Sequence, residues 1–187
     1  MTAWSERMST LAMMGNRYSV SYYELPLHLE KTFRIRGYCT VELDNLFVGL
    51  SLLHGAGISY VRIRDTPHYI FARHVIHGEP AKANHGYSNY AHYASINDGV
   101  CAEQEFTKLI WSISDDPYDH KKSPILVFRT WRRVLPLNRW DVADGFHRLA
   151  ALAALGQEEL TVATLRQRKT LVERLVGKLM REHDLQQ

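Results

Sequence analysis

A short run of five residues, Asp144-Gly-Phe-His-Arg148, combines groups suited to a negatively charged ligand. It falls between a predicted strand and a predicted helix, where the chain can offer free backbone N–H groups and the positive end of the helix dipole to an anion. Gly145 has no Cβ to obstruct a phosphate oxygen. Arg148 adds a permanently charged, forked donor, and His147 adds a donor whose charge depends on pH. The run therefore predicts phosphate binding.

The carboxylate of Asp144 would repel bare phosphate. A functional Asp144 therefore needs either a Mg²⁺ ion that bridges it to the phosphates or a substrate hydroxyl whose proton it accepts. A purely structural interpretation is equally concrete. Asp144 is then a helix N-cap, Gly145 a turn residue, and His147 and Arg148 satisfy neighbouring carbonyl and carboxylate groups.

The elements around this run follow from apolar spacing and from glycine and proline. We expect a helix that ends at Asp115-Asp116-Pro117, since proline forbids its continuation. A buried strand, a second strand, a helix stopped by Gly156 and a closing strand follow. The predicted ranges are a helix over 103–114, strands over 124–128 and 140–144, a helix over 147–155 and a strand over 160–165.

Upstream, the apolar spacing predicts a helix over 41–53, which Gly55 and Gly57 would end. A strand is expected over 58–64 and a helix over 69–76. The following stretch, from 78 to 99, is rich in Tyr and His and poor in aliphatic residues. We interpret it as a surface loop with one short helix, either a lid over a site or a loop that packs on the core.

The run from Asp144 to the glycine at 156, together with the helix 103–114 and the strand 124–128, resembles the sequence pattern of the ParB/sulfiredoxin superfamily. The resemblance covers about residues 103–165, with the strand 58–64 as a candidate for the family's first strand. It implies an α+β fold, with a small mixed sheet flanked by helices. Members of this superfamily include sulfiredoxins, CTP-binding partition proteins, proteins described as nucleases and free serine kinases.

Departures from each branch narrow the function that the resemblance implies. Sulfiredoxins carry a reactive cysteine just before the His-Arg pair, where this chain has Phe146. Partition proteins continue into a helix-turn-helix and a dimerisation domain, whereas only about twenty residues follow Leu165 here. We therefore expect neither sulfinic acid reduction nor sequence-specific DNA binding.

The kinase branch fits better, because its Asp-Gly-His-His-Arg-type motif matches Asp144, His147 and Arg148. That branch has an acidic residue after the first strand as general base, and Asp65 occupies the corresponding place. The resemblance implies that Asp65 or Asp144 deprotonates a substrate hydroxyl, with ATP or ADP and Mg²⁺ as cofactors. The phosphates would be held by Gly145, Phe146, His147 and Arg148.

Two further residues near Asp65 are candidates for substrate binding. His68 could contact the phosphate or the substrate, or it could simply start a helix after a proline. Arg64, with Arg62, could reach the anion or lie on a solvated strand face. A basic and aromatic cluster, Trp131-Arg-Arg133, could stack on a base and neutralise phosphate, or form an exposed hairpin tip.

The composition suits one domain with appendages, since 187 residues with 45% hydrophobic content can bury a single core. We expect an extension over 1–40, the domain over 41–168 with a loop insertion at about 78–100, and an amphipathic helix over 169–187. This last helix would dock on its own domain or on a second copy in a homodimer. The two cysteines, Cys39 and Cys101, belong to no CxxC pair and suggest reduced thiols.

A net charge of +3 does not demand a polyanionic partner. No apolar run is long enough for a membrane span, no signal peptide is recognisable, and no HExxH-like ligand pair occurs, so we expect a cytoplasmic chain without a metal cluster. The favoured function is a nucleotide-dependent phosphotransferase acting on a hydroxyl-bearing metabolite such as an amino acid or a sugar. The alternatives are a nucleotide- or nucleic-acid-binding module without turnover, and an interaction protein.

Overall fold

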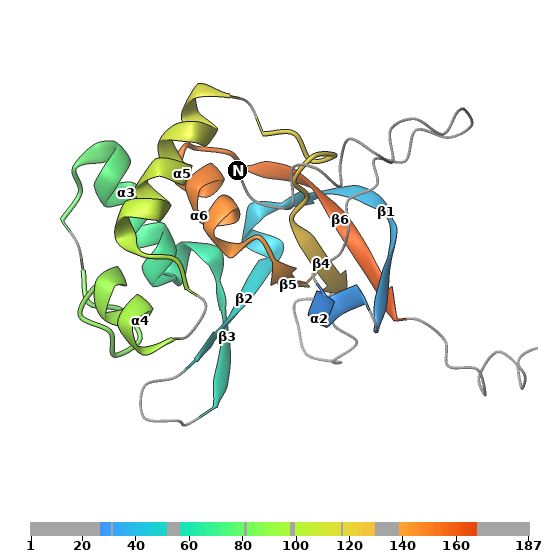
Figure 1. Cartoon of the computed structure of the whole chain (residues 1–187), viewed down its shortest axis with the longest axis horizontal. Coiled ribbons are helices and arrows are strands. Elements are labelled where there is room, and N and C mark those ends of the chain that lie inside the picture. Colours follow the sequence, from blue (N-terminus) through green and yellow to red (C-terminus); the bar gives the residue numbers. More distant parts are fainter. Residues whose placement is uncertain are drawn as a thin grey trace, which may run out of the picture.

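The computed structural model describes residues 27–30, 32–51, 57–80, 82–97, 100–116, 118–129 and 139–167. The Trp131-Arg-Arg133 cluster and the expected helix over 169–187 lie outside these ranges. Within them, a mixed sheet carries helices at one end (Figure 1). The elements are α2 Leu27–Glu30, β1 Phe33–Glu42, the 3-10 turn η1 Leu43–Asn45, β2 Leu46–Ser51, β3 Ile58–Arg62, the 3-10 turn η3 Ile63–Asp65, α3 Pro67–His77, α4 Tyr90–Ile96, α5 Glu103–Asp115, β4 Leu126–Arg129, β5 Trp140–Asp144, α6 Phe146–Ala154 and β6 Glu159–Gln167.

The sheet has six strands in the order β1-β6-β4-β5-β2-β3. The pairs β1–β6, β4–β5 and β2–β3 are antiparallel, while β4–β6 and β2–β5 are parallel. Parallel neighbours need a crossover connection, and α6 belongs to the connection that brings the chain from β5 back to β6 beside β4. The structure thus confirms the expected α+β class with a mixed sheet.

The helix predicted over 41–53 is wrong. Residues 41 and 42 end β1, η1 follows, and Leu46–Ser51 form β2 between β5 and β3. Leu46, Phe47 and Val48 are all buried, so both faces of this strand are covered. A short apolar run buried on both faces has no clear alternation, and its spacing does not distinguish a strand from a buried helix.

The sheet also begins earlier than the expected domain boundary. The edge strand β1 starts at Phe33, inside the range expected to be an extension, and pairs with β6 along its length. The strand at Ile58–Arg62, the candidate for the family's first strand, is the third strand along the chain, because β1 and β2 precede it. The predicted strand and helix after Gly57 are confirmed as β3 and α3, and the segment 78–99 contains the short helix α4.

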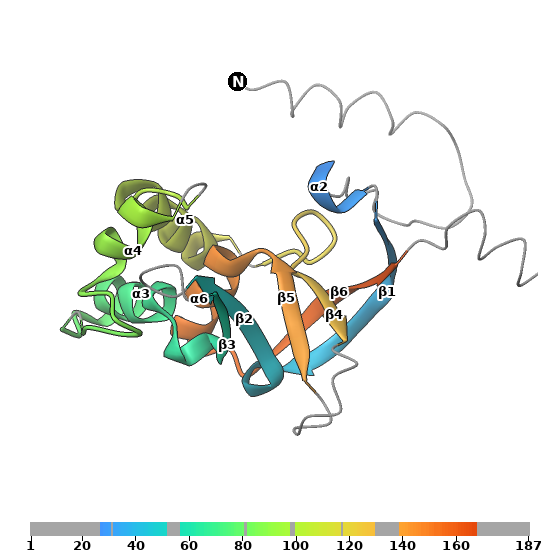
Figure 2. The same cartoon turned by 90° about the horizontal axis from the view of Figure 1, so that it is seen from below.

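The elements around the five-residue run are confirmed as α5, β4, β5, α6 and β6. Helix α6 lies between the strands and the layer formed by α3, α4 and α5 (Figure 2). Its residues from Leu149 to Ala154 are all buried, which explains an alanine-rich helix without a polar face. No helix in the described part of the chain is both long and apolar enough to cross a membrane.

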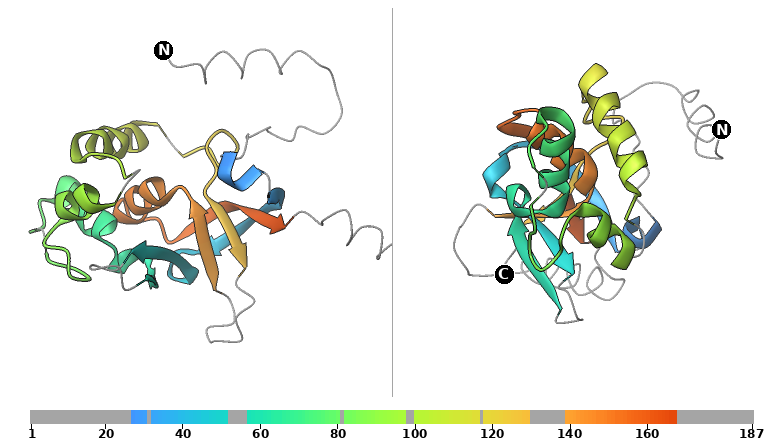
Figure 3. Two further views of the ribbon diagram at one scale, coloured as in Figure 1. Left: turned by 60° about the horizontal axis from the view of Figure 1, so that its bottom comes forward. Right: turned by 90° about the vertical axis from the view of Figure 1, so that its left-hand side faces the viewer.

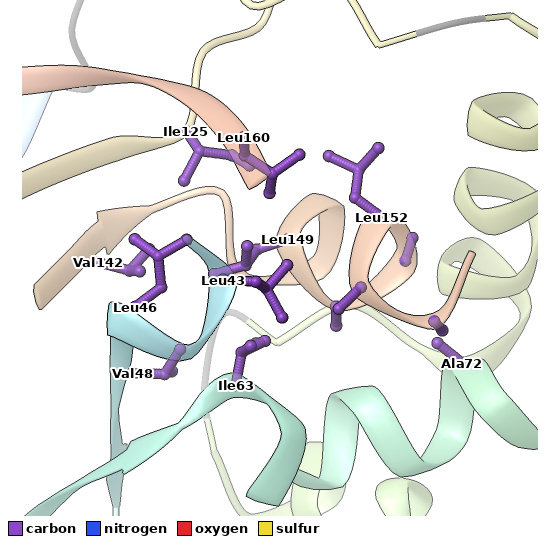
Figure 4. Close-up of a cluster of buried hydrophobic side chains, with 14 of the residues drawn as sticks. Leu43, Leu46, Val48, Ile63, Ala72, Ile125, Val142, Leu149, Leu152 and Leu160 are labelled. Atoms are coloured by element: carbon purple, nitrogen blue, oxygen red, sulfur yellow. The ribbon is translucent and has the colours of Figure 1, made fainter. Parts of the chain in front are cut away.

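The main core fills the space between α6, the two 3-10 turns and the sheet (Figure 4). Leu43 of η1 and Ile63 of η3 extend their side chains toward Leu149 of α6, and all three are at most 1% exposed. Because Leu149 lies only four residues after Gly145, this packing fixes the first turn of α6. The core thereby positions the residues that could do chemistry.

Candidate functional site

The turn between β5 and α6 depends on the backbone of Gly145. This residue has φ +92°, in the left-handed region that favours glycine, and its carbonyl accepts the first helical hydrogen bond from Leu149 N, at 2.9 Å. Gly145 is therefore the N-cap, a role that the structural interpretation gave to Asp144. A Cβ at Gly145 would lie 3.2 Å from Arg148 Nη2 and 3.3 Å from Ile125 Cα. Arg148 and Ile125 therefore occupy the space beside Gly145 that a side chain would need.

The guanidinium of Arg148 folds back over this turn. It donates to the Ser123 hydroxyl and, through Nη2, to the Pro124 carbonyl at 3.2 Å. Nη2 also lies 3.5 Å from Asp144 Oδ2. The structure thus confirms that Arg148 satisfies a neighbouring carbonyl and carboxylate. Its Nε atom is buried and has no hydrogen-bond partner among the described residues, so one donor of the fork is unused.

Asp144 and Arg148 both keep some access to solvent. Their side chains are 35% and 21% exposed, respectively. They sit at the positive end of the α6 dipole, where the first N–H groups of a helix have no intrahelical acceptor. The corner therefore brings together a carboxylate, a guanidinium and free amide donors.

The His147 side chain points away from that corner, into a cluster of rings. Its Nε2 lies 2.8 Å from the Tyr90 hydroxyl, and its ring centroid lies 4.8 Å from that of Phe106. Burial lowers the pKa of His147 to about 4, an effect opposed by the Asp144 carboxylate and reinforced by Arg148. The imidazole is neutral at pH 7 and adds no positive charge to the turn.

The same cluster holds His68, which is 2% exposed. Its ring centroid lies 4.8 Å from that of His147, and burial, with a smaller effect of the His147 charge, lowers its pKa to about 3. His68 Nδ1 has no hydrogen-bond partner among the described residues. His68 belongs to the first turn of α3, capped by Thr66, so its placement matches the helix-start interpretation.

Asp65 and Arg64 lie outside the cluster. Asp65 is exposed, and its backbone carbonyl accepts a hydrogen bond from Asn84 Nδ2 at 2.7 Å. No contact joins its carboxylate to the turn at Gly145 among the described residues. Arg64 Nε lies 3.3 Å from Asp44 Oδ1, with both side chains largely solvated. The structure therefore brings Asp144, Gly145 and Arg148 together and leaves Asp65 and Arg64 apart from them.

Sequence reasoning missed two partners of the run. Tyr90 bonds to His147 and donates to the Cys101 carbonyl at 2.7 Å, and Ser123 anchors Arg148. Tyr90 also lines a cavity of about 710 Å³ between α3, α5 and the segment 82–90. The Tyr- and His-rich composition of 78–99 was the available signal, although it did not identify which ring would reach α6.

The described side chains bear on whether the site could hold a metal ion. Among the described residues, no three His, Cys, Asp or Glu side chains gather as metal ligands do. A Mg²⁺ ion bound with a nucleotide needs only one or two carboxylates, because phosphates and water supply its other ligands. Asp144 is the carboxylate at the turn that fits this role, and the solvent-accessible part of the Arg148 guanidinium fits an anionic oxygen.

No protein-family model matches the chain, and neither does any curated protein or solved structure at a significant level. The resemblance to the ParB/sulfiredoxin superfamily stays a prediction from the sequence.

Proposed function

We propose that this protein is a nucleotide-dependent phosphotransferase that uses ATP or ADP with Mg²⁺ and phosphorylates a hydroxyl group of a small metabolite, such as an amino acid or a sugar. The observation that carries the proposal is the pairing of Asp144 with Arg148 at the start of α6, 3.5 Å apart and both partly exposed. Phosphoryl transfer needs a positioned phosphate and a group that accepts the substrate proton. This corner supplies a candidate for each.

The α6 amides and the Arg148 fork would hold the phosphates. Arg148 is already bound to Ser123 and Pro124, so its guanidinium is oriented before a ligand arrives. The Arg148 side chain is 21% exposed, so the part of its guanidinium that reaches solvent would meet a phosphate oxygen, whereas the buried Nε would not. Preoriented donors stabilise developing charge better than mobile ones, because they need no reorganisation during the reaction.

Asp144 would accept the proton of the substrate hydroxyl or hold Mg²⁺ jointly with the phosphates. Bound Mg²⁺ would neutralise phosphate charge. His147 would contribute its backbone N–H, since its ring faces Tyr90. Asp65 would need to act from outside the turn, because its carboxylate makes no contact there.

The second candidate is a module that binds nucleotide or nucleic acid without turnover. It is favoured by the separation of Asp65 from the turn, which leaves Asp144 as the one predicted proton acceptor at this corner. This function needs the phosphate donors alone, and Arg148 with the α6 amides would suffice. Nucleic-acid binding would weaken steeply with added salt, because bound phosphates release counterions.

The test combines calorimetric nucleotide binding with consumption of ATP or ADP in the presence of Mg²⁺ and a panel of amino acids and sugars. Asp144→Asn should lower turnover at least about hundredfold and leave nucleotide affinity within a few fold. Asp115→Asn, which removes an exposed carboxylate at the end of α5, is the matched control and should retain turnover. Unchanged turnover in Asp144→Asn would contradict the phosphotransferase, and nucleotide binding without any turnover would favour the module.

A further inference from the structure

The cavity between α3, α5 and the segment 82–90 has the size of a small-molecule site. Its volume of about 710 Å³ lies within the roughly 300–1,000 Å³ of known ligand pockets. None of the residues from Asp144 to Arg148 lines it. Tyr90, which contacts His147, is the link between the cavity and that run. Helices α3 and α5 and the neighbouring α4 gather on one side of the molecule, away from β1 (Figure 3).

One wall of the cavity is apolar and firmly packed. It is formed by Ile70, Phe71 and Val75 of α3. The Phe71 ring stacks on Tyr90, with centroids 4.9 Å apart and planes 27° apart, and also on Phe106 behind it. A wall of this kind suits a flat apolar body, because it offers a preformed surface that needs no ordering on binding.

The rim of the cavity carries more positive than negative charge. Lys82 and Lys108 line it, and neither forms an ion pair with another described residue. The carboxylate of Glu79 is held by Arg73, whose hydrogen bond is the main cause of its lowered pKa, with Lys82 a smaller cause. Glu103 is the one acidic residue that lines the cavity.

The start of α5 also faces this rim. Glu103 and Gln104 belong to its first turn, and the N-cap residue Ala102 has no side chain that could accept from the free amides. The positive end of this helix dipole therefore adds to the charge of the two lysines. The apolar wall and the cationic rim of this cavity together favour a ligand with one apolar end and one anionic end.

We propose that this cavity binds a small organic anion with a flat, apolar body of one or two rings and a single acidic group. The rings would lie against Phe71 and Val75, and the acidic group would lie between Lys82 and Lys108. The site is distinct from the Asp144–Arg148 corner, and its existence does not require the proposed phosphotransferase activity. Tyr90 contributes its ring to the cavity wall and its hydroxyl to His147, so an occupied cavity touches a residue that contacts the start of α6.

The test uses 2-naphthoate as the probe and 2-naphthamide as its neutral counterpart, with calorimetric titration into the full chain. The wild type should bind naphthoate at least about fivefold more tightly than naphthamide. Lys82→Gln and Lys108→Gln should each weaken naphthoate about two- to fivefold, the range of an exposed ion pair, and leave naphthamide unchanged. Glu103→Gln should strengthen naphthoate binding about twofold.

Two variants complete the design. Arg34→Gln removes an exposed charge on β1 and should change neither affinity. Thr107→Trp places a large ring in the cavity and should abolish binding of both probes; the lysine variants keep the test decisive if this chain fails to fold. Equal affinities for the two probes, an unaffected Lys82→Gln/Lys108→Gln double variant, or no naphthoate binding at millimolar concentration would each overturn the proposal.

Discussion

The corner at Gly145 and the cavity beside α3 use their charged residues in opposite ways. At the corner, Arg148 is held by Ser123, Pro124 and Asp144, and a Cβ on Gly145 would meet protein atoms on two sides. At the cavity, Lys82 and Lys108 make no ion pair with a described residue and border open space. The run that the sequence marked as a phosphate site is thus the one whose side chains are held by other protein groups. Substitutions at the corner should therefore lower stability, whereas substitutions of the two lysines should change the affinity for the cavity's ligand and leave stability nearly unchanged.

The largest expected effect concerns the ring cluster that separates the two regions. His68 and His147 have pKa values lowered to about 3 and about 4, so at pH 5 the unfolded chain binds protons that the folded chain does not. The stability that they contribute is complete above about pH 6.5 and is lost as the pH falls toward those values. Between pH 7 and pH 5 the loss should reach about 3–4 kcal/mol, at about 1.4 kcal/mol per pH unit for each histidine.

Urea unfolding at several pH values measures this effect. His68→Phe preserves the ring packing and should remove about half of the pH dependence. His85→Asn is the control, since His85 is exposed and has φ +51°, which asparagine tolerates. A pH dependence that His68→Phe leaves intact would show that the buried histidines do not cause it.

Two glycine-to-alanine substitutions distinguish close packing from backbone strain at the corner, and their effects on stability are smaller. Gly145→Ala should destabilise the protein by about 3 kcal/mol, because the methyl group meets Ile125 and Arg148 in addition to the strain of a positive φ. Gly156→Ala has a similar φ of +88° and nothing within 4 Å of its new Cβ, so it should cost only about 1 kcal/mol. Thermal and urea unfolding measure both, and equal losses would mean that the corner is not closely packed.

The next largest effect is the difference in stability lost on replacing Arg148 at the corner and Lys108 at the cavity. Arg148→Gln should cost about 2 kcal/mol in the free energy of unfolding, because Ser123, the Pro124 carbonyl and Asp144 lose their shared donor. Lys108→Gln should change stability by less than about 0.5 kcal/mol, as is usual for an exposed side chain. Urea unfolding at pH 7.5 compares them. A Lys108→Gln loss as large as that of Arg148→Gln would remove the difference between the two regions.

The smallest effect tests the contact that the regions share. Tyr90→Phe removes the hydroxyl that bonds the Cys101 carbonyl and His147 Nε2 and should cost about 1 kcal/mol. The apolar wall of the cavity keeps its ring, so affinity for 2-naphthamide should stay within about twofold. Tyr93→Phe is a matched change in the same helix. Calorimetric binding and urea unfolding on both variants separate a structural hydroxyl from one that contacts the ligand.

The sequence predicted most of the elements around the corner because each has a strong local signal. In the sequence, a proline follows the end of α5, Gly145 precedes α6 and Gly156 follows it, and the strands on either side are short apolar runs. The exception is β2, whose apolar residues face covered surfaces on both sides, so its spacing resembles that of a helix. Its partners β3 and β5 decide its conformation, and the pairing with β5 joins residues far apart in the chain.

The sequence pointed to the turn at Gly145 as the candidate site, but not to the partners of its side chains. The Arg148 guanidinium donates to Ser123 and Pro124, which lie in the loop before β4 and far from Arg148 in sequence. Its binding of phosphate stays a prediction. The sequence predicted His147 as a donor to phosphate, and His68 as either a ligand contact or a helix-start residue. Their burial comes from rings contributed by α4 and α5, which no local pattern could place against them.

The long antiparallel pairing of β1 with β6 has a consequence for how the chain folds. Val41 pairs with Leu160, so the ladder joins segments separated by more than about a hundred residues, and the loop it closes carries a large entropic cost. On a ribosome, β1 emerges long before β6, its one partner in the described sheet, and stays unpaired on both edges until most of the polypeptide has been made. Folding should consequently be slow for a chain of this size, with the β1–β6 ladder among the last contacts to form.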